Sequence, residues 1–76
     1  MEDLVRFLVC SLVSDESAVK IEREDDENSV TLHVTVAEQD LGRVIGKGGR
    51  VAVSIRTIVH SIFSKERKKI YVKFGE

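Results

Sequence analysis

Three segments of the chain alternate between apolar and polar residues. They are residues 18–24 (AVKIERE), 30–36 (VTLHVTV) and 69–74 (KIYVKF). A period of two is typical of a β-strand that buries one face and leaves the other in water. The polar residues 25–29 separate the first two segments by a single turn. This short spacing predicts an antiparallel hairpin.

Three other segments have the composition or the spacing of helices. Residues 3–13 (DLVRFLVCSLV) are helix formers and apolar on nearly every side, which is more than one small sheet can cover. Residues 37–44 (AEQDLGRV) predict a short helix. In residues 50–64 (RVAVSIRTIVHSIFS) the apolar positions recur at three and four, which predicts a longer helix with a wide apolar stripe. The charged residues 65–69 connect this helix to the last strand.

The order of these elements is α-β-β-α-α-β, which predicts an α+β fold. A helical crossover separates the second and third strands, so we expect them to run parallel through a right-handed connection. The result is a three-stranded mixed sheet with three helices on one face and water on the other. At 76 residues and 8.5 kDa we expect one domain. Its single cysteine forms no internal disulfide.

The charged residues are divided unevenly along the chain. Residues 1–40 carry eleven acidic and three basic residues, whereas residues 41–76 carry nine basic and two acidic residues. The formal net charge of −1, taken alone, argues against a nucleic-acid-binding protein. The concentration of positive charge in one half instead indicates a local site for an anionic ligand.

A basic, glycine-rich segment lies near the start of this second half. It consists of Arg43, Val44, Ile45, Gly46, Lys47, Gly48, Gly49 and Arg50 (RVIGKGGR). Gly46–Gly49 has the spacing Gly-x-x-Gly and joins two predicted helices. Unpaired N–H groups at the start of a helix favour an anion, and glycines let the backbone approach it. Phosphate is the expected ligand. The alternative is that the glycines merely permit a sharp turn, for which one or two would suffice.

Other phosphate-binding loops fit this segment less well. A Walker A loop follows a strand and carries Ser or Thr after its lysine, where this chain has Gly48. A dinucleotide-binding loop also follows a strand and has a different glycine spacing. The setting of GKGG between two helices resembles the KH domain. The segment LGRVIGKGGR followed by SIRTIV is similar to the small stand-alone bacterial KH proteins of the KhpA family. The element order is that of a type II KH domain over residues 1–76.

The resemblance implies a cleft that binds single-stranded RNA. Gly46–Gly49 would face the sugar-phosphate backbone of about four nucleotides, and Val44 and Ile45 would help to build an apolar floor under the bases. We add Arg43 and Arg50 to this site because of their charge and position. The resemblance also implies a role as an RNA chaperone, a second and larger KH-containing partner, and a part in cell elongation and envelope growth.

The same resemblance places two further features at the cleft. The backbone edge of the last strand, at Ile70 and Val72, is expected to form the opposite wall. The turn between the first two strands is expected to border the cleft, and in this chain that turn is acidic at residues 25–27. Acidic side chains beside a phosphate site weaken binding, most at low salt. The turn therefore points away, repels duplexes, or is simply solvated.

The remaining reactive side chains do not combine into a catalytic or metal site. His33 and His60 have no partner at metal-ligand spacing, and Cys10 lies in an apolar helix without an activating base. The carboxylates of the N-terminal half fall in a turn or on exposed strand positions, which does not make an acid–base pair. We therefore expect no enzyme, no metal and no cofactor.

Apolar residues on the first and the long helix exceed what one small sheet requires. They fit a homodimer, or a heterodimer with a second KH-containing protein. In that alternative the domain is a protein-interaction module and the partner carries the RNA binding. The competing explanation is that a small helical layer covers both helices by itself. A phosphate clamp also leaves open single-stranded DNA as the ligand.

The N-terminal apolar run, Leu4–Val13, is too short to cross a bilayer and contains Arg6. The acidic residues before it are wrong for a signal peptide. We therefore expect a soluble, cytoplasmic protein with no membrane partner.

Overall fold

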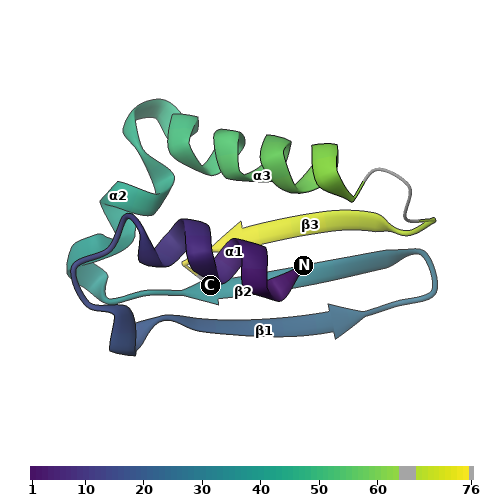
Figure 1. The fold of residues 1–76 in the computed structure, drawn as a ribbon, viewed down its shortest axis with the longest axis horizontal. Helices are drawn as coiled ribbons and strands as arrows, with labels where there is room; N and C mark the ends of the chain where they lie inside the picture. The colour runs from purple at the N-terminus through teal and green to yellow at the C-terminus, as the bar shows by residue number, and fades with distance from the viewer. Residues whose placement is uncertain (64–66, 76) are drawn as a thin grey trace.

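The computed structural model describes residues 1–63 and 67–75, in which helices and strands follow the predicted order (Figure 1). The helices are α1 (Glu2–Cys10), α2 (Leu41–Ile45) and α3 (Arg50–Ile62), and the strands are β1 (Lys20–Asp25), β2 (Ser29–Thr35) and β3 (Lys69–Phe74). Short 3-10 turns lie at Glu16–Ala18 (η1), Glu38–Asp40 (η2) and Lys47–Gly49 (η3). The α+β fold and the order α-β-β-α-α-β are confirmed.

The strands form one sheet in the order β1-β2-β3, with β2 in the centre. β1 and β2 are antiparallel, as the short turn predicted, and β2 and β3 are parallel, as the helical crossover predicted. Leu32 of β2 lies opposite Arg23 on one side and Val72 on the other. β3 is therefore an edge strand, and Figure 1 shows α3 running alongside it.

The core lies between one face of the sheet and the helices. Its buried side chains are Val5, Val9, Val19, Val30, Leu32, Val34, Val44, Ala52, Ile55, Val59, Ile70 and Val72. Along β2 the side chains alternate between buried and more accessible, as the sequence pattern predicted: Leu32 is fully buried and Thr35 is exposed. The predicted inward face of β2 and β3 is thus the face that packs on the helices.

Two helix boundaries differ from the sequence prediction. α1 ends at Cys10 rather than at residue 13, because the N–H of Leu12 bonds to the carbonyl of Val9, three residues back, at 2.9 Å and the chain tightens there. The predicted helix over 37–44 is divided at Asp40 into η2 and α2. Residue 64 of the predicted long helix and residues 65 and 66 of the predicted connection lie outside the described residues.

The apolar stripe of α3 is wider than the surface that the sheet covers. Ile55 and Val59 are buried at its centre, whereas Ile58 is 39% exposed and Ile62 is 59% exposed. On α1, Phe7 is 69% exposed. Ile58 and Ile62 therefore form the part of this stripe that the sheet leaves exposed. The predicted surplus of apolar surface is present on both helices.

Candidate nucleic-acid interface

The glycine-rich segment forms the turn between α2 and α3. Gly46, Gly48 and Gly49 have φ angles of 76°, 66° and 80°, a region in which side chains are strained. The turn is closed by bonds from the N–H of Gly46 to the Gly42 carbonyl (2.8 Å) and from the N–H of Gly49 to the Gly46 carbonyl (3.1 Å). The turn therefore requires all three glycines by itself. The expectation that one or two would suffice is wrong, and the number of glycines alone is no sign of a ligand.

The surroundings of the glycines distinguish their roles. A Cβ atom at Gly46 would lie 2.8 Å from the backbone nitrogen of Val51, so this glycine also allows α3 to pack closely. A Cβ atom at Gly48 or Gly49 would meet nothing within 4 Å. The N–H groups of Lys47 and Gly48 have no hydrogen-bond partner among the described residues. The tip of the turn is therefore bare backbone with two donors available to an approaching anion.

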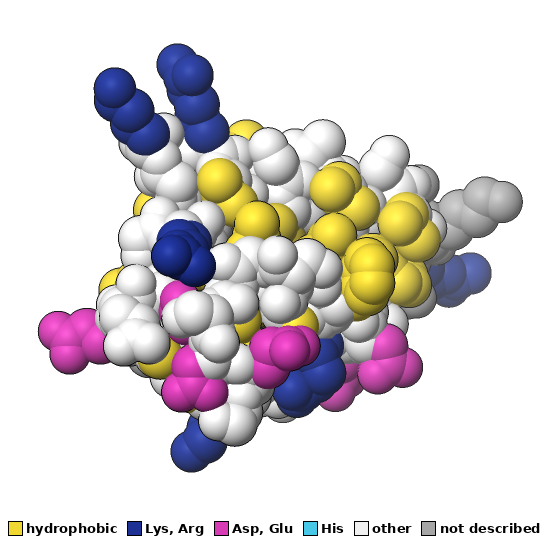
Figure 2. All heavy atoms as spheres, turned by 60° about the vertical axis from the view of Figure 1, so that its left-hand side comes forward, with side chains coloured by type: hydrophobic (Ala, Val, Ile, Leu, Met, Phe, Trp, Pro, Cys, Tyr) yellow, Lys and Arg dark blue, Asp and Glu magenta, His cyan; other side chains and the backbone are white. Residues whose placement is uncertain are grey.

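Three basic side chains surround this tip. Arg43, Lys47 and Arg50 are exposed, and none of them has an acidic partner within 4.0 Å in the described part of the chain. Figure 2, in which this end of the molecule comes forward, shows Lys and Arg side chains projecting from the upper corner and Asp and Glu side chains gathered lower down. The structure thus brings all three predicted cations to one end of the molecule.

The apolar residues of the predicted site differ in accessibility. Val44 is fully buried and belongs to the core, whereas Ile45 is half-buried. Of these two residues only Ile45 has accessible apolar surface. Val53, one turn into α3, is 55% exposed. Val53 lies outside the apolar stripe of this helix, so no sequence pattern indicated it.

Two side chains of α3 bond to the outer edge of β3. The Nε of Arg56 donates to the carbonyl of Val72 at 2.9 Å, and the Nε2 of His60 lies 2.7 Å from the carbonyl of Ile70. The expected opposite wall of the cleft thus has these two carbonyls already occupied. The guanidinium of Arg56 also lies over the ring of Phe74, 5.7 Å from its centroid. No sequence pattern indicated these contacts.

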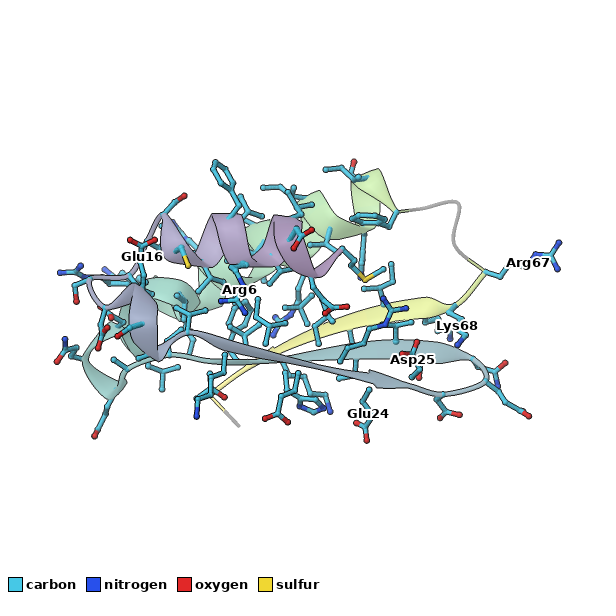
Figure 3. All side chains as sticks on the ribbon, turned by 60° about the horizontal axis from the view of Figure 1, so that its bottom comes forward. Arg6, Glu16, Glu24, Asp25, Arg67 and Lys68 are labelled. Atoms are coloured by element: carbon cyan, nitrogen blue, oxygen red, sulfur yellow. The ribbon has the colours of Figure 1, made fainter. Side chains whose placement is uncertain are left out.

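The acidic turn lies away from the glycine-rich turn. Figure 1 shows the β1–β2 turn at the far end of the sheet from the junction of α2 and α3. Asp25 at this end bonds to Arg23 and lies 3.7 Å from the ammonium of Lys68 (Figure 3). The hydrogen bond from Arg23 lowers the pKa of Asp25. Of the alternatives for this turn, the structure favours the one in which it points away from the glycine-rich turn, so its acids do not oppose a phosphate at Lys47.

One carboxylate of the segment predicted as a short helix over 37–44 is buried. Asp40 is fully buried and accepts bonds from the N–H and hydroxyl of Ser14 (3.0 and 2.8 Å) and from the N–H of Asp15 (3.1 Å). These bonds, with the backbone N–H of Ser14 first, lower the pKa of Asp40, and the charge of Arg43 acts in the same direction. The bonds tie the segment after α1 to the start of α2, which carries the glycine-rich turn.

The other reactive side chains lie apart from this turn. His33 on the outer face of the sheet lies 3.1 Å from the carboxylate of Glu24; Figure 3 shows Glu24 pointing away from the helices. Cys10 is a half-buried free thiol. The described residues bring together no group of three His, Cys, Asp or Glu side chains able to hold a metal. No helix within residues 1–63 and 67–75 has the length and apolar character needed to span a membrane.

Comparison with known proteins identifies the family. The family model for the KhpA/KhpB KH domain matches residues 2–74. The chain belongs to the KhpA/KhpB KH-domain family. The RNA-binding protein KhpA of Listeria monocytogenes is 42% identical over the full length of both chains. That of Oceanobacillus iheyensis is 39% identical over 95% of this chain and 96% of its own. The names of these relatives describe RNA binding and not catalysis, which agrees with the expectation that this chain is not an enzyme.

Solved structures show the same fold at low sequence identity. Two chains of the protein Era match 96% of this chain with TM-scores of 0.61 and 0.62 and 16% identity. One is Aquifex aeolicus Era bound to GDP and aluminium fluoride, and the other is Era in complex with nucleotides of 16S ribosomal RNA. This chain spans only 30% of either Era chain. The likeness confirms the KH fold for the KhpA/KhpB member described here.

Proposed function

We propose that this KhpA/KhpB-family chain binds single-stranded RNA by holding its phosphate backbone at Gly46–Gly49. The observation that carries this proposal is the bare turn, where the N–H groups of Lys47 and Gly48 lack partners among the described residues and three exposed cations surround them. Backbone donors and positive side chains together suit a phosphate. The relatives named RNA-binding protein KhpA support RNA as the polymer.

Each part of the site has a separate task in this proposal. Lys47 and the free N–H groups hold one phosphate, and Arg43 and Arg50 attract its neighbours. Ile45 and Val53 provide apolar contact for unpaired bases, with Val44 beneath. Only about four nucleotides fit such a site, so few phosphates are neutralised and a single copy binds weakly. Weak binding suits an RNA chaperone that holds a strand only briefly.

Fluorescence anisotropy with a short unstructured RNA tests the clamp directly. Lys47→Asp/Gly48→Asp places two carboxylates where the phosphate is expected. The charge-matched control, Lys20→Asp/Thr35→Asp, makes the same charge change at two exposed positions that face each other across β1 and β2. Gly48→Asn, which places a side chain at the φ of 66° without adding charge, separates strain in the turn from the effect of charge and should also keep binding. We expect the loop variant to lose binding while the control keeps it, with circular dichroism showing that both remain folded. Equal binding by the two variants would exclude the clamp, and a matched DNA oligomer shows whether the sugar matters.

A second candidate function is protein interaction through the helical layer. Phe7 of α1 and Ile58 and Ile62 of α3 are exposed apolar side chains, and Figure 2 shows hydrophobic side chains gathered in a band over these helices. Such a patch fits a second copy of the chain or a larger KH-containing partner. A dimer also joins two weak RNA sites and raises the overall affinity. If RNA binding is absent from the isolated chain, this surface carries the function and the partner holds the RNA.

The cellular role follows from the family resemblance alone. The proposal includes a part in cell elongation and envelope growth, which the resemblance to the KhpA family implies, and the cytoplasmic location expected from the N-terminal sequence. The cellular role requires that the chain binds RNA at the glycine-rich turn or binds a partner through the helical layer. Depletion of the chain, with rescue by wild type but not by the loop variant, connects the phenotype to the clamp.

A further inference from the structure

The outer edge of β3 is covered by side chains of α3. An edge strand presents unpaired N–H and carbonyl groups that can bond to another molecule. On β3 the carbonyls of Ile70 and Val72 point toward α3, where they accept from His60 and Arg56. A base entering between α3 and β3 therefore meets these two side chains before it meets the strand backbone.

The nitrogens of Arg56 that make no hydrogen bond within the described part of the chain determine what this side chain can bind. Its Nε is committed to the Val72 carbonyl, while its two terminal nitrogens bond to no residue in the described part of the chain. The contact with the ring of Phe74 holds the guanidinium plane further. A guanidinium fixed at Nε presents its two terminal N–H donors as a fork. Such a fork matches two adjacent acceptors, as on a carboxylate, a phosphate, or the N7 and O6 of guanine.

The position of Arg56 favours a base over a phosphate. Val53, Arg56 and His60 are three and four residues apart, so they share one flank of α3. Arg56 is six residues from the start of α3 at Arg50, about 9 Å along the helix from the glycine-rich turn. That distance lies within a site for about four nucleotides. In the proposed complex the RNA backbone is held at the glycine-rich turn, so the RNA bases face the flank of α3 that carries Val53, Arg56 and His60.

We infer that Arg56 is a base-reading residue that favours guanine, with His60 closing the strand edge beside it. This inference rests on the proposed function, since it assumes that RNA is held at Gly46–Gly49. A carbonyl oxygen only accepts hydrogen bonds, so His60 donates to the carbonyl of Ile70 through Nε2 and covers the edge of β3 there. Arg56 contacts the N7 and O6 of one guanine. Phosphate contacts at the turn carry no sequence information, so a preference for guanine has to arise from groups such as this one.

Heptamers of uridine with a single guanosine test the inference. Wild type is expected to bind the best of these at least about fivefold more tightly than all-uridine RNA. Replacing that guanosine by 7-deazaguanosine, which lacks the N7 acceptor, should remove the gain. Arg56→Lys keeps the charge and a donor for the Val72 carbonyl but loses the fork. This variant should bind every heptamer with the affinity that wild type has for all-uridine RNA. His60→Ala is the matched control, expected to keep the preference for guanine.

Other outcomes would overturn the inference and separate it from the clamp. If wild type binds all heptamers alike while Lys47→Asp/Gly48→Asp abolishes binding, the clamp stands and Arg56 does not read guanine. If Arg56→Lys weakens binding to every heptamer equally and lowers the melting temperature, Arg56 only covers the strand edge. If wild type binds no heptamer, both the clamp and the base-reading role are wrong.

Discussion

Ser14 donates two hydrogen bonds to one carboxylate oxygen of Asp40, from its backbone N–H at 3.0 Å and from its hydroxyl at 2.8 Å. The N–H of Asp15 binds the other oxygen at 3.1 Å. Asp40 is also the residue immediately before α2. A single buried carboxylate therefore fixes the direction in which the chain enters α2, and with it the turn at Gly46, six residues after Asp40. The position of the proposed RNA site depends on a residue that has no part in binding.

The first prediction concerns Asp40→Asn. An asparagine keeps one acceptor oxygen but turns its NH₂ group toward a second donor, so at least one buried N–H loses its partner. We expect the melting temperature at pH 7 to fall by about 5 °C or more. Because the folded-state pKa of Asp40 is lowered, wild type loses this stabilisation as the pH falls from about 4 through that pKa.

Melting curves between pH 7 and pH 2 check both parts of this prediction. The difference between wild type and Asp40→Asn should be largest at neutral pH and should shrink in acid. Glu38→Gln, at an exposed neighbouring position, serves as the control and should change little. A difference that stays constant over the whole pH range would mean that the charge of Asp40 is not what stabilises the fold.

The second prediction contrasts Gly42, which lies within α2, with Gly46, which follows its last residue. Gly46→Ala places a Cβ atom 2.8 Å from the Val51 nitrogen at a φ of 76°, and we expect it to lower the free energy of unfolding by about 1–3 kcal/mol. Gly42 lies within α2 with nothing within 4 Å of its Cβ position. Gly42→Ala should therefore raise that free energy by roughly 0.5–1 kcal/mol. Urea unfolding measures both, and equal effects would contradict this geometry.

The alternation of apolar and polar residues predicted the three strands, because each strand has one face against the core and one in water. Val30, Leu32 and Val34 are buried, and the strand pairings follow from the short turn and the helical crossover. The boundary at Asp40 was not predictable in this way. It is set by Ser14, which lies 26 positions earlier, and a local pattern carries no information about a contact at that distance. The same reason explains why a buried role for this carboxylate was missed.

The proposed site was predictable to the extent that it is local in sequence. Gly46, Lys47 and the flanking arginines are contiguous, so a short motif contains them. Arg56 and His60 instead act through β3, which follows more than ten residues after Arg56 in the chain. The role of these two residues depends on which side of α3 faces the edge of β3. That relation exists only once α3 and β3 have packed together.

The third prediction is the salt dependence of RNA binding. Each phosphate neutralised on a single strand contributes about −0.7 to the slope of log K against log salt. With Arg43, Lys47 and Arg50 each meeting one phosphate, the slope should be about −2. Arg43→Ala should make it shallower by about 0.7, whereas Lys20→Ala on the outer sheet face should leave it unchanged. Anisotropy titrations at four salt concentrations give the slopes, and a slope near zero would rule out a phosphate clamp.

The fourth prediction concerns the apolar surface of α1 and α3. Phe7 and Ile62 are 69% and 59% exposed, and their burial between two copies would remove apolar area from water. We expect sedimentation at micromolar concentration to show a dimer for wild type and a monomer for Phe7→Glu and Ile62→Glu. Tyr71→Glu is the matched control, because Tyr71 is 46% exposed but lies on the sheet, and it should stay dimeric.

Loss of the dimer should also weaken RNA binding, by about tenfold or more, because two linked sites act together. This effect should appear in Phe7→Glu even though the glycine-rich turn is unchanged in that variant. If wild type is a strict monomer, the homodimer is excluded and the patch belongs to a different partner. If the variants are monomeric but bind RNA as well as wild type does, each copy works alone, and the exposed apolar residues serve assembly without contributing to RNA affinity.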